Sequence, residues 1–192
     1  MNSIIAKSKI RQKILKFLFA NEEKSFYLSE IAKIAGTSAG NAQREMNRLQ
    51  KEGVVKSEKR GNLRYFELDK ENSAFSDIEN IVKKTIGVEA ELAEIFGKLK
   101  RVDFAFIFGS YAKDELRSGS DIDVVVIGDP DEEELNRKIS LAEKSIGREI
   151  NYHLYSFPEF KKKIKRDSFL KNIVRKYILL SGDKNELKKL LR

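Results

Sequence analysis

The sequence predicts a two-domain protein (α+β followed by α/β): a small domain of helices and a hairpin, a helical linker, and a small mixed sheet with C-terminal helices. Three observations indicate this architecture. Apolar residues recur at helical spacing through much of residues 4–51, and Gly61-Asn62 between two extended segments is typical of a hairpin. From Val102 onward, apolar runs alternate with helical patterns. We therefore expect domains at 1–72 and 101–192, joined by a linker at 73–100.

The composition limits the class of protein. At 192 residues, with 41% apolar and 35% charged residues, the chain can bury one sizeable core or two small ones. The absence of cysteine excludes disulfides and thiolate metal sites and favours a reducing compartment. The first residues alternate charged and apolar side chains, unlike a signal peptide, and no 18-residue apolar stretch follows. We expect a cytoplasmic protein without a membrane partner.

The net charge of +8 is unevenly distributed. Residues 1–72 hold 15 Lys and Arg against 9 acidic residues, residues 73–155 hold 11 against 17, and residues 156–192 hold 12 against 4. A basic N-terminal segment suits phosphate neutralisation by a DNA-binding module. We interpret the C-terminal surplus as solvated helix faces above apolar stripes.

The first domain reads as three helices and a hairpin. Helical spacing predicts a first helix up to about residue 20, a second over about 28–35 that ends at Gly36, and a third over about 40–51 that ends before Gly53. The first helix is indicated by Ile4, Ile5, Ile10, Ile14, Leu15, Phe17 and Leu18. Two extended segments follow, with basic residues at or near the hairpin tip.

This order is that of a winged helix-turn-helix, whose third helix enters the major groove and whose hairpin contacts phosphates or the minor groove. Polar side chains on the outer face of the third helix suit base edges, and basic side chains on the hairpin suit phosphates. The predicted DNA-binding residues are Asn41, Gln43, Arg44, Asn47, Arg48, Lys59, Arg60 and Arg64. The alternative is a winged helix that binds protein, with a merely solvated polar face.

The linker has apolar residues at helical intervals, and Gly87 and Gly97 interrupt them only mildly. The pattern predicts a connecting helix or helix pair. Such an element also suits a dimer interface. Because winged-helix readers often bind paired half-sites, a homodimer is expected.

The second domain begins with two strongly apolar strands, "VDFAFIFGS" and "DIDVVVIGD", on either side of a short helix and loop. A helix over about 131–146 and a third strand, "REINYHLYS", follow. Ser156 with Glu159 three residues later predicts a capped helix start. Helical spacing then continues through Phe169, Ile173, Val174, Tyr177 and Leu180, and a last short helix follows Gly182-Asp183.

The segment "FGSYAKDELRSGSDIDVVVIG" has the residue types that hold a metal-bound nucleoside triphosphate. Gly109 allows close approach of a phosphate, and Ser110 at a helix start offers its hydroxyl and N–H. Asp121 and Asp123, two residues apart on a strand, point the same way and suit Mg²⁺ or Mn²⁺. Two metals so held favour in-line attack on the α-phosphate. Each motif alone is common; their combination between apolar strands favours a functional site.

"GSYAKDELRSGSDIDVVV" resembles the Gly-Ser and Asp-x-Asp signature of the DNA polymerase β-type nucleotidyltransferase superfamily, especially its minimal members. The region from Phe26 to Leu68 resembles the winged half of two-domain predicted transcriptional regulators that carry such a domain. The resemblance covers nearly the whole chain. It implies that Asp121 and Asp123 bind Mg²⁺ and that a nucleoside triphosphate binds at Gly109, Ser110, Lys113 and Ser120. It also implies transfer of a nucleoside monophosphate to a hydroxyl on protein or nucleic acid.

The chain departs from this family at the third carboxylate, which in active members acts as general base and metal ligand on the next strand. The matching position is Asn151, which cannot take a proton. Glu149 lies on the same strand face but is shifted by about 6 to 7 Å. His153, the only histidine, is also on that face, where a structural role is the usual one. The predicted catalytic set is Asp121, Asp123, Glu149 and Asn151.

Three functions remain open from the sequence. The first is an enzyme that transfers a nucleotidyl group and is brought to DNA by its N-terminal domain. The second is a catalytically weakened regulator that senses nucleotide and adjusts DNA binding. The third is the antitoxin of a two-protein system, which modifies or binds a small helical toxin partner.

Overall fold

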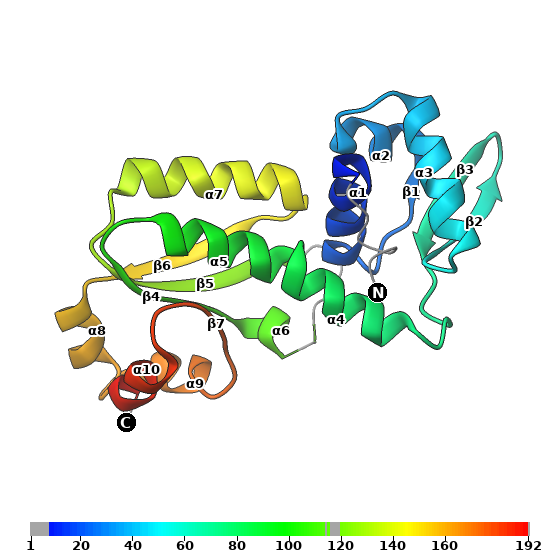
Figure 1. The fold of residues 1–192 in the computed structure, drawn as a ribbon. Helices are drawn as coiled ribbons and strands as arrows, with labels where there is room; N and C mark the ends of the chain where they lie inside the picture. The colour runs from blue at the N-terminus through cyan, green and yellow to red at the C-terminus, as the bar shows by residue number, and fades with distance from the viewer. Residues whose placement is uncertain (1–7, 114, 116–119, 192) are drawn as a thin grey trace. The chain divides into compact units, whose positions relative to one another are not determined.

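The computed structural model describes residues 8–113, 115 and 120–191, and these residues form a mixed α/β fold with two small sheets (Figure 1). The chain divides into two compact units. Unit 1 comprises Met1–Val88 with Ser145–Gly147, and unit 2 comprises Glu89–Lys144 and Arg148–Arg192. No helix among the described residues is both long and apolar enough to cross a bilayer.

The described residues of unit 1 form four helices and a three-stranded antiparallel sheet in the order β1-β3-β2. Its elements are α1 (Lys9–Ala20), β1 (Phe26–Tyr27), α2 (Leu28–Ala35), α3 (Ala39–Lys51), β2 (Val55–Arg60), β3 (Leu63–Leu68) and α4 (Phe75–Thr85). The helices and the hairpin lie where the sequence predicts them. The two-residue strand β1 is an addition, and Ile4 and Ile5 of the predicted first helix lie outside the described residues.

Local signals explain where these helices begin and end. The Ser38 hydroxyl accepts a hydrogen bond from the backbone N–H of Asn41 and so caps α3. Gly36 takes a left-handed conformation, with φ of 63°, and ends α2. On the inner face of α3, Met46 and Leu49 are fully buried against a core that includes Phe66 of β3. The helix therefore presents its remaining, polar face outward.

Unit 2 is built on a four-stranded sheet in the order β6-β5-β4-β7. The central strand β5 is parallel to the edge strand β6, whereas the other central strand, β4, is antiparallel to both β5 and β7. Its elements are α5 (Val88–Lys98), β4 (Val102–Phe108), α6 (Gly109–Ala112), β5 (Ile122–Gly128), α7 (Glu132–Ile146), β6 (Ile150–Tyr155), α8 (Phe157–Lys163), α9 (Ser168–Ile173), β7 (Ile178–Ser181) and α10 (Lys184–Leu190).

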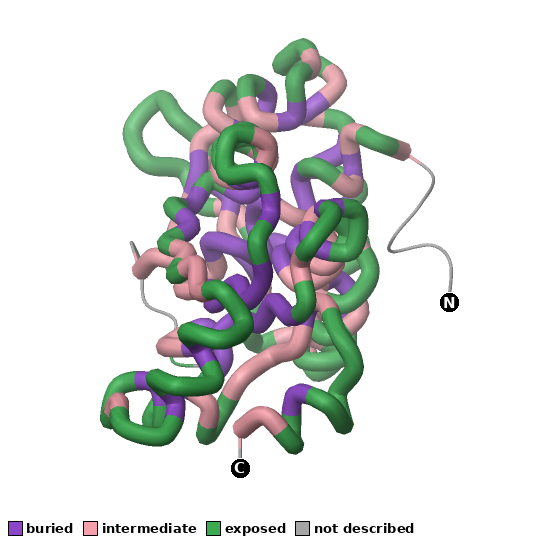
Figure 2. The backbone as a smooth tube through the Cα atoms, turned by 90° about the vertical axis from the view of Figure 1, so that its left-hand side faces the viewer, coloured by how far each residue is buried: buried purple, intermediate pink, exposed green. Residues whose placement is uncertain are grey.

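Helices cover both faces of this sheet: α5 and α7 lie on one side, and α8, α9 and α10 on the other (Figure 1). Burial on both faces explains the continuous apolar runs of β4 and β5, where nearly every residue is buried. The helices instead alternate between buried and exposed segments (Figure 2). The core under α8 to α10 joins Phe106 and Val125 to Phe160, Leu170 and Leu187.

One predicted helix is wrong at its end. Helical spacing extended through Tyr177 and Leu180, but α9 ends at Ile173 and residues 178–181 form β7. Ile178 and its neighbours pair with β4, which would otherwise be an open edge of the sheet. The predicted loop between α6 and β5 includes residues 114 and 116–119, which lie outside the described residues.

Candidate active site at the end of the unit 2 sheet

The first part of the site is a sharp corner where β4 meets α6. Gly109 has φ of 73°, a conformation that side chains other than glycine's rarely adopt. A Cβ at this position would lie 2.5 Å from Oδ2 of Asp123. The predicted glycine therefore lets the backbone lie directly against the carboxylate. Ser110 follows at the start of α6. Because this helix has only four residues, it offers individual backbone N–H groups to a ligand rather than the dipole of a long helix.

The two predicted aspartates lie at the start of β5. Asp121 directly precedes the strand, Ile122 is fully buried, and Asp123 is the first strand residue on the opposite face. Asp123 pairs with Phe108 on β4 and with Asn151 on β6. Both aspartates are half-buried. The structure thus brings the Gly109 corner and both carboxylates together at one end of the sheet.

The environment of Asp123 opposes its ionisation. Burial raises the pKa of its carboxyl group above the ordinary value, the negative charge of Asp121 raises that pKa further, and His153 lowers it. A partly desolvated pair of like charges is a site that a cation would stabilise.

The position of the family's third carboxylate is occupied by the side-chain amide of Asn151, as the sequence indicates. Asn151 Nδ2 donates a hydrogen bond of 2.8 Å to Oδ2 of Asp121. Glu149 precedes β6 and is exposed, and its backbone carbonyl accepts from the N–H of Ile122. Within the described residues, no group of three or more His, Cys, Asp or Glu side chains is arranged to hold a metal ion.

The remaining predicted nucleotide-binding residues border the loop between α6 and β5. Lys113 ends α6 and its side chain is exposed, while Ser120 is half-buried one residue before Asp121. The Ser120 carbonyl accepts a hydrogen bond of 2.6 Å from Arg148 Nη1.

Two residues near the site were missed by the sequence reasoning. Arg148 is only 7% exposed and fixes the backbone beside Asp121. Phe169, predicted to lie on an apolar helix face, is 45% exposed, and its ring contacts that of His153. No local pattern marks either residue, because both act through contacts between segments distant in the sequence.

The predicted DNA-binding residues of α3 lie on the helix face away from the core. Arg44, Asn47 and Arg48 are exposed, and Asn41 and Gln43 are half-buried. Arg44 donates to the Asn41 side chain and Gln43 to the Asn47 side chain, so the polar face is internally hydrogen-bonded.

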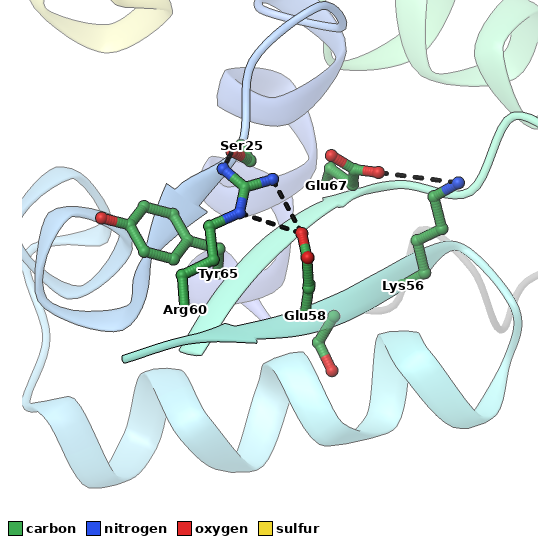
Figure 3. Close-up of a pocket in the computed structure, with 7 residues that line it drawn as sticks. Ser25, Lys56, Glu58, Arg60, Tyr65 and Glu67 are labelled. Atoms are coloured by element: carbon green, nitrogen blue, oxygen red, sulfur yellow. Dashed lines mark hydrogen bonds and ion pairs between the residues drawn. The ribbon is translucent and has the colours of Figure 1, made fainter. Parts of the chain in front are cut away.

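The predicted hairpin residues fall on two different faces. Arg64 donates to Ser57 and to Gln50 of α3, and strand alternation places Lys59 on this same face. Arg60 lies on the other face, where it pairs with Glu58, donates to Ser25 and stacks 5.0 Å from the Tyr65 ring centre (Figure 3). There it lines a shallow cavity of about 250 Å³ together with Lys56 and Glu67.

Comparison with known proteins gives a separate result for each part of the chain. Residues 89–180 match the family "Nucleotidyltransferase domain", and residues 1–78 match the family "EarA-like". No curated protein sequence matches the chain.

The similarity to solved structures is distant. A toxin-antitoxin with AMP-PNP is 16% identical, with a TM-score of 0.40, over 54% of this chain and 81% of its own. A mutant of the toxin-antitoxin MntA-HpeT is 14% identical, with a TM-score of 0.38, over 54% and 80%. The Shewanella oneidensis complex of tri-AMPylated HEPN toxin with MNT antitoxin is 14% identical, with a TM-score of 0.36, over 54% and 76%. Residues 89–180 are therefore similar to the nucleotidyltransferase domain family.

Proposed function

We propose that the chain is a divalent-metal-dependent nucleotidyltransferase that transfers a nucleoside monophosphate from a nucleoside triphosphate to a hydroxyl group on protein or nucleic acid, and that unit 1 brings it to DNA. One observation carries the catalytic half of this proposal. The Gly109 corner lies against the Asp123 carboxylate, with no room between them for a side chain, and Asp121 lies two residues away. Phosphate groups held at the corner would therefore lie beside the carboxylates, where one cation can bind both.

The residues present fit a hard divalent cation. Asp121 and Asp123 offer carboxylate oxygens, and Mg²⁺ typically uses one or two carboxylates together with substrate phosphates. Burial and then the Asp121 charge raise the pKa of Asp123, and a cation between the two carboxylates would offset both effects. When bound, Mg²⁺ or Mn²⁺ would neutralise charge that develops on the α-phosphate and on the departing pyrophosphate.

The protein groups supply positioning and proton transfer. Gly109 and Ser110 hold phosphate oxygens, and the Lys113 ammonium balances their charge. The acceptor oxygen forms a bond to the α-phosphorus while the bond from that phosphorus to pyrophosphate breaks. The hydroxyl proton passes to a base on the face of β6, where Glu149 and His153 are the candidates and Asn151 is excluded by its chemistry.

Labelled transfer tests the proposal. The protein is incubated with Mg²⁺ and each nucleoside triphosphate labelled at the α-phosphate, with protein and nucleic-acid acceptors. We expect transfer by the wild type and none by Asp121→Asn. The control is Asp103→Asn, which removes an exposed carboxylate on β4 and should leave transfer unchanged. Absence of transfer and of pyrophosphate release with every nucleotide and acceptor would reject the enzyme.

A second function, a regulator that senses nucleotide without turnover, is favoured by the Asn151 contact. The amide donates a hydrogen bond to Oδ2 of Asp121, one of the two oxygens that this carboxylate offers to a metal ion. This regulator would bind nucleotide and change the affinity of unit 1 for DNA. DNA binding in a gel mobility shift that depends on nucleotide, without pyrophosphate release, supports the regulator. DNA binding that is the same with and without nucleotide opposes it.

For DNA contact, we propose the exposed face of α3 together with the hairpin face that carries Lys59 and Arg64. This surface is supported by the exposure of Arg44 and Arg48 and by the hydrogen bonds that join Arg64 to α3. Arg44 and Arg48 suit base edges, so Arg44→Ala or Arg48→Ala should weaken sequence discrimination. Equal affinity of both variants and the wild type across operator and random DNA would reject this face.

A further inference from the structure

Three aromatic rings, those of His153 and of two phenylalanines, meet beside the proposed active site. Phe108 ends β4, His153 lies on β6, and Phe169 lies on α9. Their ring centres are 5.8 Å apart for Phe108 and His153, 5.9 Å for Phe108 and Phe169, and 5.7 Å for His153 and Phe169. These separations are typical of rings in direct contact. The three residues therefore form one cluster, here named the aromatic platform.

The aromatic platform lies on the same sheet face as Asp123. Phe108 pairs with Asp123 across β4 and β5, and directly paired residues share a face. His153 is two residues after Asn151, which pairs with Asp123 from the other side. Phe108 is also the residue immediately before Gly109. The platform thus adjoins both the phosphate corner and the carboxylate pair.

Two of the three rings are open to solvent. Phe108 is only 4% exposed and forms the base of the platform, whereas Phe169 is 45% exposed and His153 is exposed. Helix α9 is fixed without Phe169, because Leu170 is fully buried and Ile173 nearly so. The core thus holds the helix while the Phe169 ring remains outside.

The Phe169 position is also fixed locally. Its backbone N–H donates to Oδ1 of Asp167, 2.8 Å away, which is the cap of α9. Contacts with two other rings then limit the side chain's rotation. An aromatic ring that is half exposed yet held in place suits a flat apolar ligand, because little conformational entropy is lost on binding.

We propose that Phe169 and His153 bind the base of the nucleoside triphosphate by ring stacking, while its phosphates lie at the Gly109 corner. This inference rests on the proposed nucleotide site and extends it to the base. Stacking accepts every base because each has a π face, and purines offer the larger area. The platform therefore confers affinity for nucleotides in general, with ATP and GTP held more tightly than UTP and CTP.

The test compares ligands with and without a base. Calorimetry measures binding of ATP, UTP and inorganic triphosphate, each with Mg²⁺, to the wild type, Phe169→Ala, Phe169→Tyr and Phe157→Ala. Phe157 is the matched control, since it is a phenylalanine of similar exposure, 38%, on α8. The Phe169→Ala substitution should weaken ATP binding by about 10- to 100-fold, the range expected for loss of one stacking partner. Triphosphate binding should be unchanged, Phe169→Tyr should retain ATP, and Phe157→Ala should bind both ligands as the wild type does.

This inference alone would be overturned by ATP binding to Phe169→Ala that equals ATP binding to the wild type, or by equal losses of affinity for ATP and triphosphate in that variant. A wild type that binds triphosphate but gains no affinity from the base would also overturn it. A wild type that binds neither ATP nor triphosphate would instead overturn the proposed nucleotide site, and the base platform with it. A circular dichroism melt of each variant reports whether the fold is retained.

Discussion

Replacement of Gly109 by alanine tests the corner of the site most sharply. The φ of 73° costs a non-glycine residue about 1 to 2 kcal/mol. The added Cβ would also lie 2.5 Å from Asp123 Oδ2, whereas unstrained contacts begin at about 3.5 Å. The carboxylate must therefore retreat by about 1 Å, a misplacement that can lower turnover by about 100-fold.

The control is the same substitution in a helix of the same unit. Gly97 lies in α5 and is exposed, and a Cβ there would meet nothing within 4 Å. We expect Gly97→Ala to leave nucleotide binding and transfer unchanged and to raise stability by up to about 1 kcal/mol. Urea unfolding, calorimetry with Mg²⁺ and ATP, and labelled transfer are measured on both variants. Nucleotide binding and transfer by Gly109→Ala at wild-type levels would refute the assigned corner.

Three further predictions concern unit 1. Arg11 is 3% exposed and pairs with the buried Glu45, so Arg11→Ala should lower the free energy of unfolding by about 3 to 5 kcal/mol; a loss below about 1 kcal/mol in urea unfolding would contradict this. Burial raises the pKa of Glu22 from 4.5 to about 7, against the lowering by Lys83. The folded state therefore binds this proton more tightly than the unfolded state, and stability should fall from about pH 4.5 to about pH 7, by about 1 to 2 kcal/mol after screening. Glu22→Gln should abolish that fall, and an unchanged pH dependence of unfolding would count against the assignment. In DNA titrations, Lys59→Ala should lower the slope of log affinity against log salt concentration by about 1. Arg60→Ala should change this slope less, because Arg60 is already paired with Glu58. A larger effect of Arg60→Ala than of Lys59→Ala would place DNA on the hairpin face shown in Figure 3.

The helices and the hairpin of unit 1 were predictable because their signals are local. Ser38 and Gly36 mark helix ends by side-chain capping and by left-handed backbone, which depend on a few neighbouring residues. The pair Gly61-Asn62 marks the hairpin in the same way. Strand β1 escaped prediction because two residues, Phe26 and Tyr27, are too few to form a pattern.

Strand β7 was mistaken for helix because a short apolar run fits either structure. Its strand conformation depends on β4, more than 70 residues earlier in the chain, which offers unpaired backbone groups. The partners of Arg148 and Phe169 are likewise fixed only when distant segments meet. Asp121, Asp123 and Asn151 were accessible from sequence, since the residue types and spacing on two apolar strands already define one end of a sheet.

The central claim is that the two aspartates hold a cation against phosphates at Gly109. Anomalous scattering from a crystal grown with Mn²⁺ and a non-hydrolysable nucleoside triphosphate measures the cation position directly. We predict a manganese peak bound to carboxylate oxygens of Asp121 and Asp123, with the phosphates against Gly109 and Ser110. A manganese peak elsewhere, or nucleotide bound away from this corner, would contradict it.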